Sequence, residues 1–182
     1  PPRSTLFPYT TLFRSLIASL WAMRHAGLLS GVVLSSPWFR LARPPPAVKV
    51  LAAKLVGRVV PWLPMDAGLE AAQLTSDPEM QRWTDRDPLY CRKATPRWFT
   101  EAGRAQVEAL RRAGELDVPL LVLAAGADPI ADPAAARAFY EASGARDKKL
   151  VVYDGFRHEL FNELRRDEPI AEAVAWLSAR VC

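Results

Sequence analysis

Two residues, Asp128 and His158, combine side-chain type and position in a way that could support acid–base chemistry. Asp128 lies in the loop GADPIAD after one apolar run, and His158 lies in the loop DGFRHE after another. In open α/β sheets ligands bind beyond the carboxyl ends of the strands, so residues that follow strands are the first site candidates. If the two strands are neighbours, the carboxylate can fix the imidazole tautomer and stabilise the imidazolium formed during acyl transfer. The sequence therefore predicts an acid–base pair that requires a nucleophile.

Each candidate also has a plainer interpretation. An aspartate in such a loop is often a turn or capping residue, and a histidine beside an acidic loop is often structural or solvated. The nearby Asp132 precedes Pro133, which favours a helix N-cap over a catalytic role. His25 falls at the end of a predicted helix, where an exposed imidazole complements the helix dipole, and it is predicted to be structural.

The elements that would position this pair alternate between strand and helix. Short apolar runs bounded by Gly, Pro or charged residues indicate buried strands at 31–37, 118–125 and 149–153. Helical patterns cover 16–25, 97–114, 134–143 and 169–181, the last with Ile170, Val174 and Leu177 on one face. This alternation predicts an α/β class with a mostly parallel sheet flanked by helices.

Between the first two strands the chain makes a long apolar excursion. Residues 38–75 contain aromatic residues, the run Pro44-Pro45-Pro46 and a helix-like stretch over 48–60. The segment is either an ordinary helical excursion or a cap that covers a substrate.

Composition excludes several other classes of protein. The 182 residues include 24 basic and 20 acidic side chains, and the basic ones are interleaved with acids, so no nucleic acid partner is expected. Cys91 and Cys182 have no His or Cys at metal-ligand spacing, which gives no sign of a metal site or a disulfide. With no secretory signal or long apolar run, a reducing, cytoplasmic location is expected.

The first fifteen residues, PPRSTLFPYTTLFRS, match the translation of one reading frame of a DNA string that looks like a widely used sequencing-library adapter. Segments of this kind are set aside before the fold is considered. We therefore expect residues 1–15 to be an artefact and the genuine sequence to begin near Leu16.

Three longer stretches resemble a known family: GVVLSSPWF, LTSDPEMQRWTDRDPLYCRKATPRWFTE, and the region from VPLLVLAAGADPIAD to DKKLVVYDGFRHELFNE. They are similar to monoacylglycerol lipases and lysophospholipase-like hydrolases, which are grouped under the serine aminopeptidase S33 label and have the α/β-hydrolase fold. The resemblance covers nearly all of residues 16–180. It implies that residues 16–182 form the C-terminal part of such a domain.

The resemblance also implies a catalytic order of Ser, Asp and His, with the serine on a G-x-S-x-G elbow. Asp128 then matches the family acid and His158 the family base. The serine should lie about four residues before Leu16, where this chain has Leu12 inside the adapter-like segment. The nucleophile is therefore expected to be absent, and the fragment is predicted to be inactive.

In such a family a cap, here about residues 38–85, would cover an acyl pocket lined by Trp38, Phe39, Leu63 and Met65. The implied substrate is a monoacylglycerol, a lysophospholipid or a similar small ester, with no metal or organic cofactor. The apolar cap could also contact a membrane or lipid surface transiently. Two alternatives remain open: a non-catalytic binding protein on a hydrolase scaffold, or another activity of the fold, such as a peptidase or acyltransferase.

Overall fold

The computed structural model describes residues 8–180. Its helices and strands, in chain order, are α1 (Pro8–Arg24), β1 (Val32–Ser35), α2 (Ala47–Val59), β2 (Met65–Asp66), α3 (Ala71–Leu74), α4 (Pro78–Arg86), β3 (Lys93–Ala94), α5 (Pro96–Arg111), β4 (Leu120–Ala125), α6 (Pro133–Ala142), β5 (Lys148–Tyr153) and α7 (Asp167–Ser178). Short 3₁₀ turns follow α1 and α5 and precede α7, as η1 (Ala26–Leu28), η2 (Ala113–Glu115) and η3 (Leu160–Asn162).

The main sheet is parallel and has the strand order β1-β4-β5. All three strands coincide with the predicted apolar runs, so the predicted α/β architecture is confirmed. β4 lies in the centre and every one of its residues is buried. A strand covered on both faces needs apolar side chains at successive positions, which explains the uninterrupted run Leu120–Ala125.

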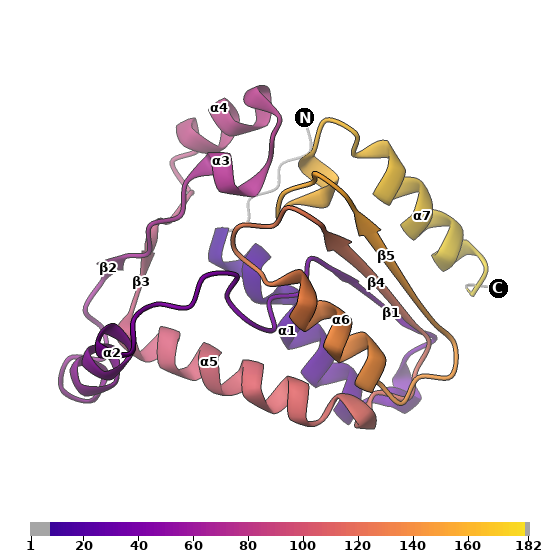
Figure 1. Cartoon of the computed structure of the whole chain (residues 1–182), viewed down its shortest axis with the longest axis horizontal. Coiled ribbons are helices and arrows are strands. Elements are labelled where there is room, and N and C mark those ends of the chain that lie inside the picture. Colours follow the sequence, from indigo (N-terminus) through magenta and orange to yellow (C-terminus); the bar gives the residue numbers. More distant parts are fainter. Residues whose placement is uncertain (1–7, 181–182) are drawn as a thin grey trace.

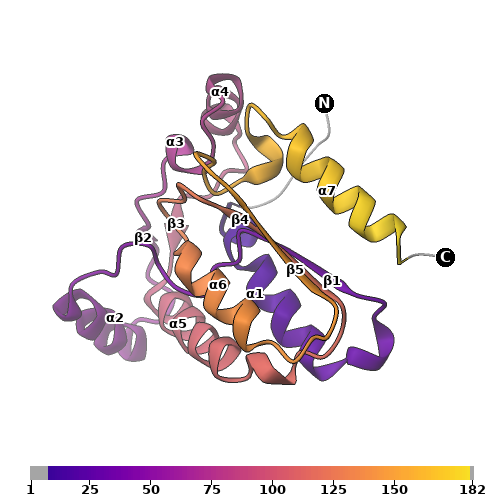
Figure 2. The same cartoon turned by 45° about the vertical axis from the view of Figure 1, so that its right-hand side comes forward.

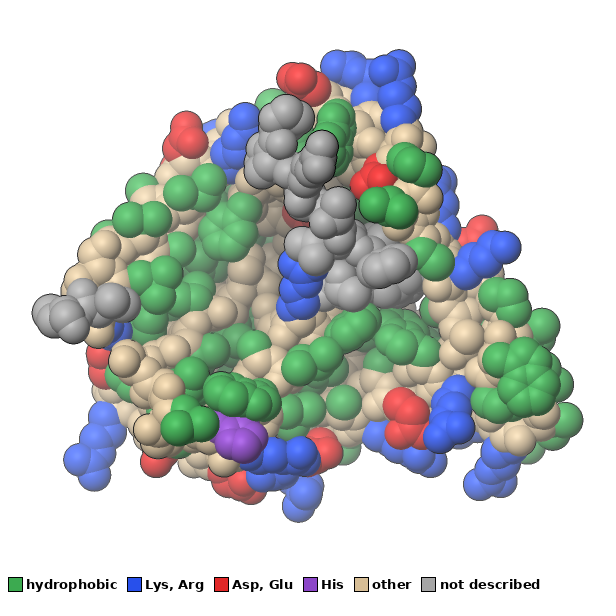
Figure 3. Space-filling view, turned by 180° about the vertical axis from the view of Figure 1, so that it is seen from behind, with side chains coloured by type: hydrophobic (Ala, Val, Ile, Leu, Met, Phe, Trp, Pro, Cys, Tyr) green, Lys and Arg blue, Asp and Glu red, His purple; other side chains and the backbone are tan. Residues whose placement is uncertain are grey.

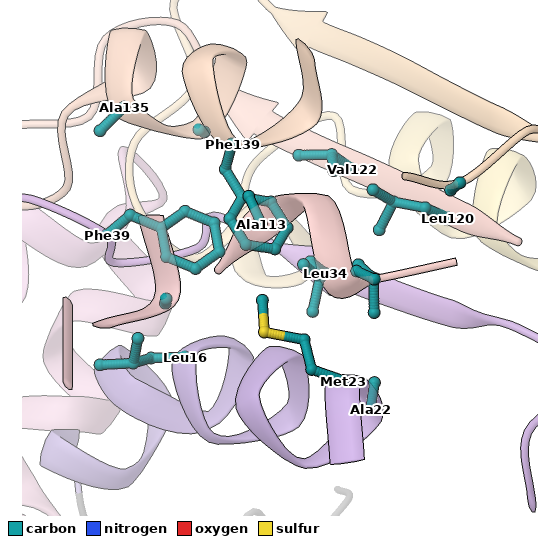
Figure 4. Close-up of a cluster of buried hydrophobic side chains, with 14 of the residues drawn as sticks. Leu16, Ala22, Met23, Leu34, Phe39, Ala113, Leu120, Val122, Ala135 and Phe139 are labelled. Carbon is teal, nitrogen blue, oxygen red and sulfur yellow. The ribbon is translucent and has the colours of Figure 1, made fainter. Parts of the chain in front are cut away.

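Helices cover both faces of this sheet (Figures 1 and 2). α1, α5 and α6 pack on one face, where alternate β4 residues meet Leu34, Met23 and Phe139 in a buried cluster (Figure 4). α7 packs on the other face, where the remaining β4 residues meet Trp176 and Tyr153. Because successive side chains of a strand point to opposite faces, one short strand joins two cores.

The last helix buries a row of residues next to the one that the sequence pattern marked. Ile170, Val174 and Leu177 do share a face of α7, but they are 40%, 56% and 43% exposed. The buried row lies one residue earlier along the helix and contains Ala173 and Trp176. Figure 3, seen from behind, shows hydrophobic side chains exposed over α7 and over α2.

α1 begins earlier than predicted. The periodicity indicated a helix from Leu16, whereas the described helix starts at Pro8 and includes part of the adapter-like segment. Phe13 in that segment lies against Trp98, with ring centroids 5.7 Å apart. The origin of residues 1–15 remains a prediction.

The excursion between β1 and α5 contains α2, α3, α4 and the antiparallel pair β2–β3. Met65 pairs with Ala94, so this segment extends past residue 85. α3 and α4 lie beside the loop between β5 and α7, while α2 lies at the opposite end of the molecule, near the start of α5 (Figure 1). The excursion therefore touches the end of the sheet at which β4 and β5 finish.

No helix within residues 8–180 is long and apolar enough to cross a membrane.

Candidate active site

The loops after β4 and β5 meet at the carboxyl end of the sheet. Ala125 and Tyr153 are partners at the ends of these parallel strands. Gly126 then donates its backbone N–H to the Tyr153 carbonyl at 2.8 Å. A Cβ at this position would lie only 3.0 Å from that oxygen, so glycine allows the two loops to approach closely. The predicted convergence of Asp128 and His158 depends on this close approach.

Asp128 and His158 are in direct contact. The Oδ2 atom of Asp128 lies 2.7 Å from Nδ1 of His158, and both side chains are almost completely buried. The other oxygen, Oδ1, accepts the backbone N–H groups of Ile130 at 2.8 Å and Ala131 at 2.9 Å. These two bonds fix the carboxylate and direct Oδ2 at the imidazole. An Nδ1–H that donates to Asp128 leaves Nε2 as the basic nitrogen, as acyl-transfer chemistry requires.

Of the two rival candidates, Asp132 has the N-cap role that the sequence favoured. Asp132 accepts the N–H of Ala134 at 2.8 Å as the N-cap of α6, and it also forms an ion pair with Arg40. His25 follows α1 and is exposed, with its ring 4.6 Å from that of Trp21. Among the described residues, neither forms a hydrogen bond or ion pair with Asp128 or His158.

Within residues 8–180 no serine hydroxyl forms a hydrogen bond to His158. The Ser15 hydroxyl instead donates to the carbonyl oxygen of Ser35 at 2.8 Å. Ser36 is buried, has a positive φ of 40°, and its hydroxyl has no partner among the described residues. Leu12, at the position where the family resemblance places the nucleophile, lies inside α1.

A cavity of about 330 Å³ lies between the excursion and the core. Its walls are mostly apolar and include Trp38, Met65, Trp98 and Ile130. Trp38 and Trp98 stack with ring centroids 5.8 Å apart. Because Ile130 also donates its backbone N–H to Asp128, the cavity begins next to the loop that holds the acid.

Only part of the predicted pocket lining faces this cavity. Trp38 and Met65 line it, whereas Leu63 does not and is 41% exposed. Phe39 is a core residue that is 1% exposed and stacks on Phe139 at 4.1 Å (Figure 4). Phe39 therefore does not line this cavity, because its ring packs in the core against α6.

The sequence did not single out Trp98 or Ile130 as lining residues. The signal for Trp98 was its place in the first turn of α5, immediately after the excursion. The signal for Ile130 was its position in the same loop as Asp128.

One further polar group is the hydroxyl of Tyr90, which is buried although the residue is partly exposed. Burial, reinforced by the Glu159 carboxylate, raises the pKa of Tyr90 to about 12. Its hydroxyl has no hydrogen-bond partner among the described residues and remains neutral at physiological pH. Among the same residues no group of three His, Cys, Asp or Glu side chains is arranged to hold a metal ion.

The sequence is similar to that of known hydrolases. Residues 15–165 match the family described as "Serine aminopeptidase, S33". A phospholipase, YtpA, from Bacillus subtilis is 29% identical over 163 residues, which are 88% of this chain and 63% of the relative. A monoacylglycerol lipase from Mycolicibacterium smegmatis is 28% identical over 162 residues, covering 88% of this chain and 58% of the relative.

A solved structure shows the same arrangement. The monoacylglycerol lipase of Paleococcus ferrophilus superposes with a TM-score of 0.88 at 26% identity, over 93% of this chain and 66% of the lipase. The fold is therefore that of the α/β hydrolases, as the resemblance implied. The chain spans about three fifths of the length of the two curated relatives.

Proposed function

Because this chain belongs to the serine aminopeptidase S33 family, we propose that Asp128 and His158 are the acid and base of an ester hydrolase site. The observation that supports this most strongly is the 2.7 Å contact between Asp128 Oδ2 and His158 Nδ1 at the carboxyl ends of two adjacent strands. Parallel α/β sheets bind their ligands at this end.

We propose a distinct step for each of the two residues. His158 Nε2 takes the proton of an attacking serine hydroxyl and later returns a proton to the leaving alcohol. Asp128 stays ionised, holds the ring orientation and stabilises the imidazolium between these steps. The nucleophile must come from a serine elbow, and the described residues place no serine hydroxyl against His158. We propose that the chain as printed is inactive for this reason.

The substrate we propose is a small acyl ester of the monoacylglycerol or lysophospholipid type. Its acyl chain would occupy the cavity of about 330 Å³ lined by Trp38, Met65 and Trp98. Burial of apolar surface contributes about 25 cal/mol per Å², so such a cavity rewards a hydrocarbon chain. The relatives whose names are a phospholipase and a monoacylglycerol lipase support the same substrate class.

A serine-directed probe and a chimeric protein test the assignment. The printed chain should not react with a serine-directed fluorophosphonate. A chimera in which residues 16–182 follow the part of the P. ferrophilus lipase that this chain does not match should react and should hydrolyse monoacylglycerol. In that chimera His158→Ala should abolish labelling, whereas Asp154→Asn, an exposed aspartate in the His158 loop, should not. An active His158→Ala chimera would refute the proposal.

We also propose that the cap touches lipid surfaces through α2. Val48, Leu51, Leu55 and Val59 form an exposed apolar stripe on this helix, and α2 carries basic but no acidic residues. An amphipathic helix of this composition binds anionic interfaces.

Flotation with phosphatidylglycerol vesicles measures this contact. The double substitution Leu51→Glu and Leu55→Glu should lower binding at least about tenfold, since each buried leucine contributes about 1.5–3 kcal/mol. Leu177→Glu on α7 is the control, because it replaces another exposed leucine, 43% exposed, at the other end of the molecule. Equal losses in both variants would show that the contact is not specific to α2.

A further inference from the structure

The loop that carries His158 is hydrogen-bonded directly to the cap. Segment 157–163 contacts segment 72–76, which contains the end of α3 and the turn before α4. The residues on both sides of the histidine take part. The Arg157 guanidinium donates to the carbonyl oxygens of Ala72 and Thr75, and Glu159 donates its N–H to Leu74 at 2.7 Å.

Glu163 is the centre of this contact. It is a carboxylate that is only 2% exposed, and the proposed acyl-transfer chemistry does not use it. Oε1 accepts the backbone N–H of Arg157 at 2.8 Å and that of Ser76 at 3.0 Å. Oε2 accepts the Ser76 hydroxyl. One side chain thus joins the residue immediately before His158 to the cap.

The chemistry of these bonds explains why a carboxylate is suited to the position. An ionised carboxylate has only acceptors, and three donors converge on its two oxygens. A buried carboxylate is costly unless it is satisfied in this way, and bonds to a charged acceptor are stronger than neutral ones. Loss of the carboxylate would leave partly buried donors of both segments without this partner.

We propose that Glu163 is a positioning residue for His158, and that the alignment of the imidazole on Asp128 depends on the docked cap segment 72–76. The inference rests on the proposed function only in taking His158 as the base. Two further contacts support the docking: the Thr75 hydroxyl donates to the Asn162 carbonyl at 2.7 Å, and Arg166 lies 3.6 Å from Asp77.

The test is the exchange with solvent of the proton on His158 Nδ1, followed by ¹⁵N NMR in the chain itself. Glu163→Leu fills much of the same volume without acceptors, and it should speed this exchange at least about tenfold. The amides of Arg157 and Ser76 should exchange faster by a similar factor. Glu163→Gln keeps one oxygen for the two amides and offers an NH₂ to the Ser76 hydroxyl, so it should stay within about threefold of the wild-type rate.

Lys148→Met is the matched control for lost stability. Lys148 Nζ donates to three backbone carbonyls at the end of α6, and it lies at the opposite end of β5 from His158. This variant should lower the melting temperature without changing exchange at His158. Ser76→Ala, which removes only the hydroxyl donor, provides a milder probe if Glu163→Leu does not fold, and it should accelerate exchange at His158 selectively.

Three results are decisive against the proposal or its premise. Equal acceleration in Lys148→Met and Glu163→Leu would mean that Glu163 acts only through global stability. An unchanged His158 proton in both Glu163→Leu and Ser76→Ala would overturn the positioning role. A wild-type spectrum without a hydrogen-bonded proton between His158 and Asp128 would instead refute the acid–base pair on which the proposed function depends. Failure of the positioning role and failure of the proposed function are therefore distinguishable.

Discussion

The two oxygens of Asp128 have different partners, and two substitutions separate them. Oδ1 accepts the buried amides of Ile130 and Ala131, while Oδ2 accepts from His158. Asp128→Asn keeps an oxygen for the two amides but presents an NH₂ group to the imidazole. Asp128→Ala removes every acceptor. We therefore expect the alanine variant to lose stability and the asparagine variant chiefly to change the histidine tautomer.

The magnitudes follow from what each change leaves unpaired. A buried N–H without an acceptor costs about 1–3 kcal/mol. Asp128→Ala leaves two such amides unpaired, so we expect the free energy of unfolding to fall by about 2–6 kcal/mol. The asparagine variant loses only the charged character of one bond, or about 1 kcal/mol. Its NH₂ group forces Nδ1 to accept, which moves the imidazole proton to Nε2. In the hydrolytic chimera this tautomer should lower kcat by about 10⁴-fold.

Urea unfolding followed by tryptophan fluorescence measures the difference in stability, and imidazole ¹⁵N shifts report the tautomer of His158. Equal destabilisation by the two variants would show that Oδ1 does not hold the loop amides. A proton that stays on Nδ1 in Asp128→Asn would refute the orientation of the pair, because an amide NH₂ cannot accept it.

Three other predictions concern the scaffold and the cavity. A Cβ at Gly144 would overlap the carbonyl oxygen of Gly114, so Gly144→Ala should lower the free energy of unfolding by about 1–3 kcal/mol in urea titrations. Hydrogen bonds from Arg112 lower the pKa of Glu108 below 4.5; the stability that this adds is present above pH 4.5 and is lost as the pH falls through the lowered pKa. Melting curves of Arg112→Gln and wild type should therefore converge in acid. Ala53→Trp should fill part of the cavity and weaken binding of a long-chain fluorescent fatty acid at least about tenfold, with a smaller effect on a short-chain one.

The sheet and the position of the pair could be predicted because both depend on local signals. The strands are short apolar runs bounded by turn residues, and Asp128 and His158 each follow one of them. Whether the two side chains meet is a non-local question, since it requires β4 and β5 to be neighbours. The apolar runs do not specify strand order, and the family resemblance implied only that the two residues act in one site.

Side-chain direction was harder to predict than element type. Trp38 and Phe39 are adjacent aromatic residues, yet one lines the cavity and the other fills the core. Their directions depend on the turn after β1, where Ser36 has a positive φ, and residue type alone does not contain that information. In α7 two neighbouring rows are apolar, and the buried one is decided by where Trp176 fits against the sheet.

The role of Glu163 could not be predicted from the sequence. In the sequence it is an acidic residue in HELFNE, a block that marked the family resemblance but suggested no role for the glutamate. Its burial is tolerable only because Ser76, 87 positions earlier, supplies two of its three donors. The same separation makes the contact informative, because a bond between distant segments ties the His158 loop to the cap rather than to its own strand. A change in how the cap docks must then alter the surroundings of His158, even though no cap side chain is hydrogen-bonded to the imidazole among the described residues.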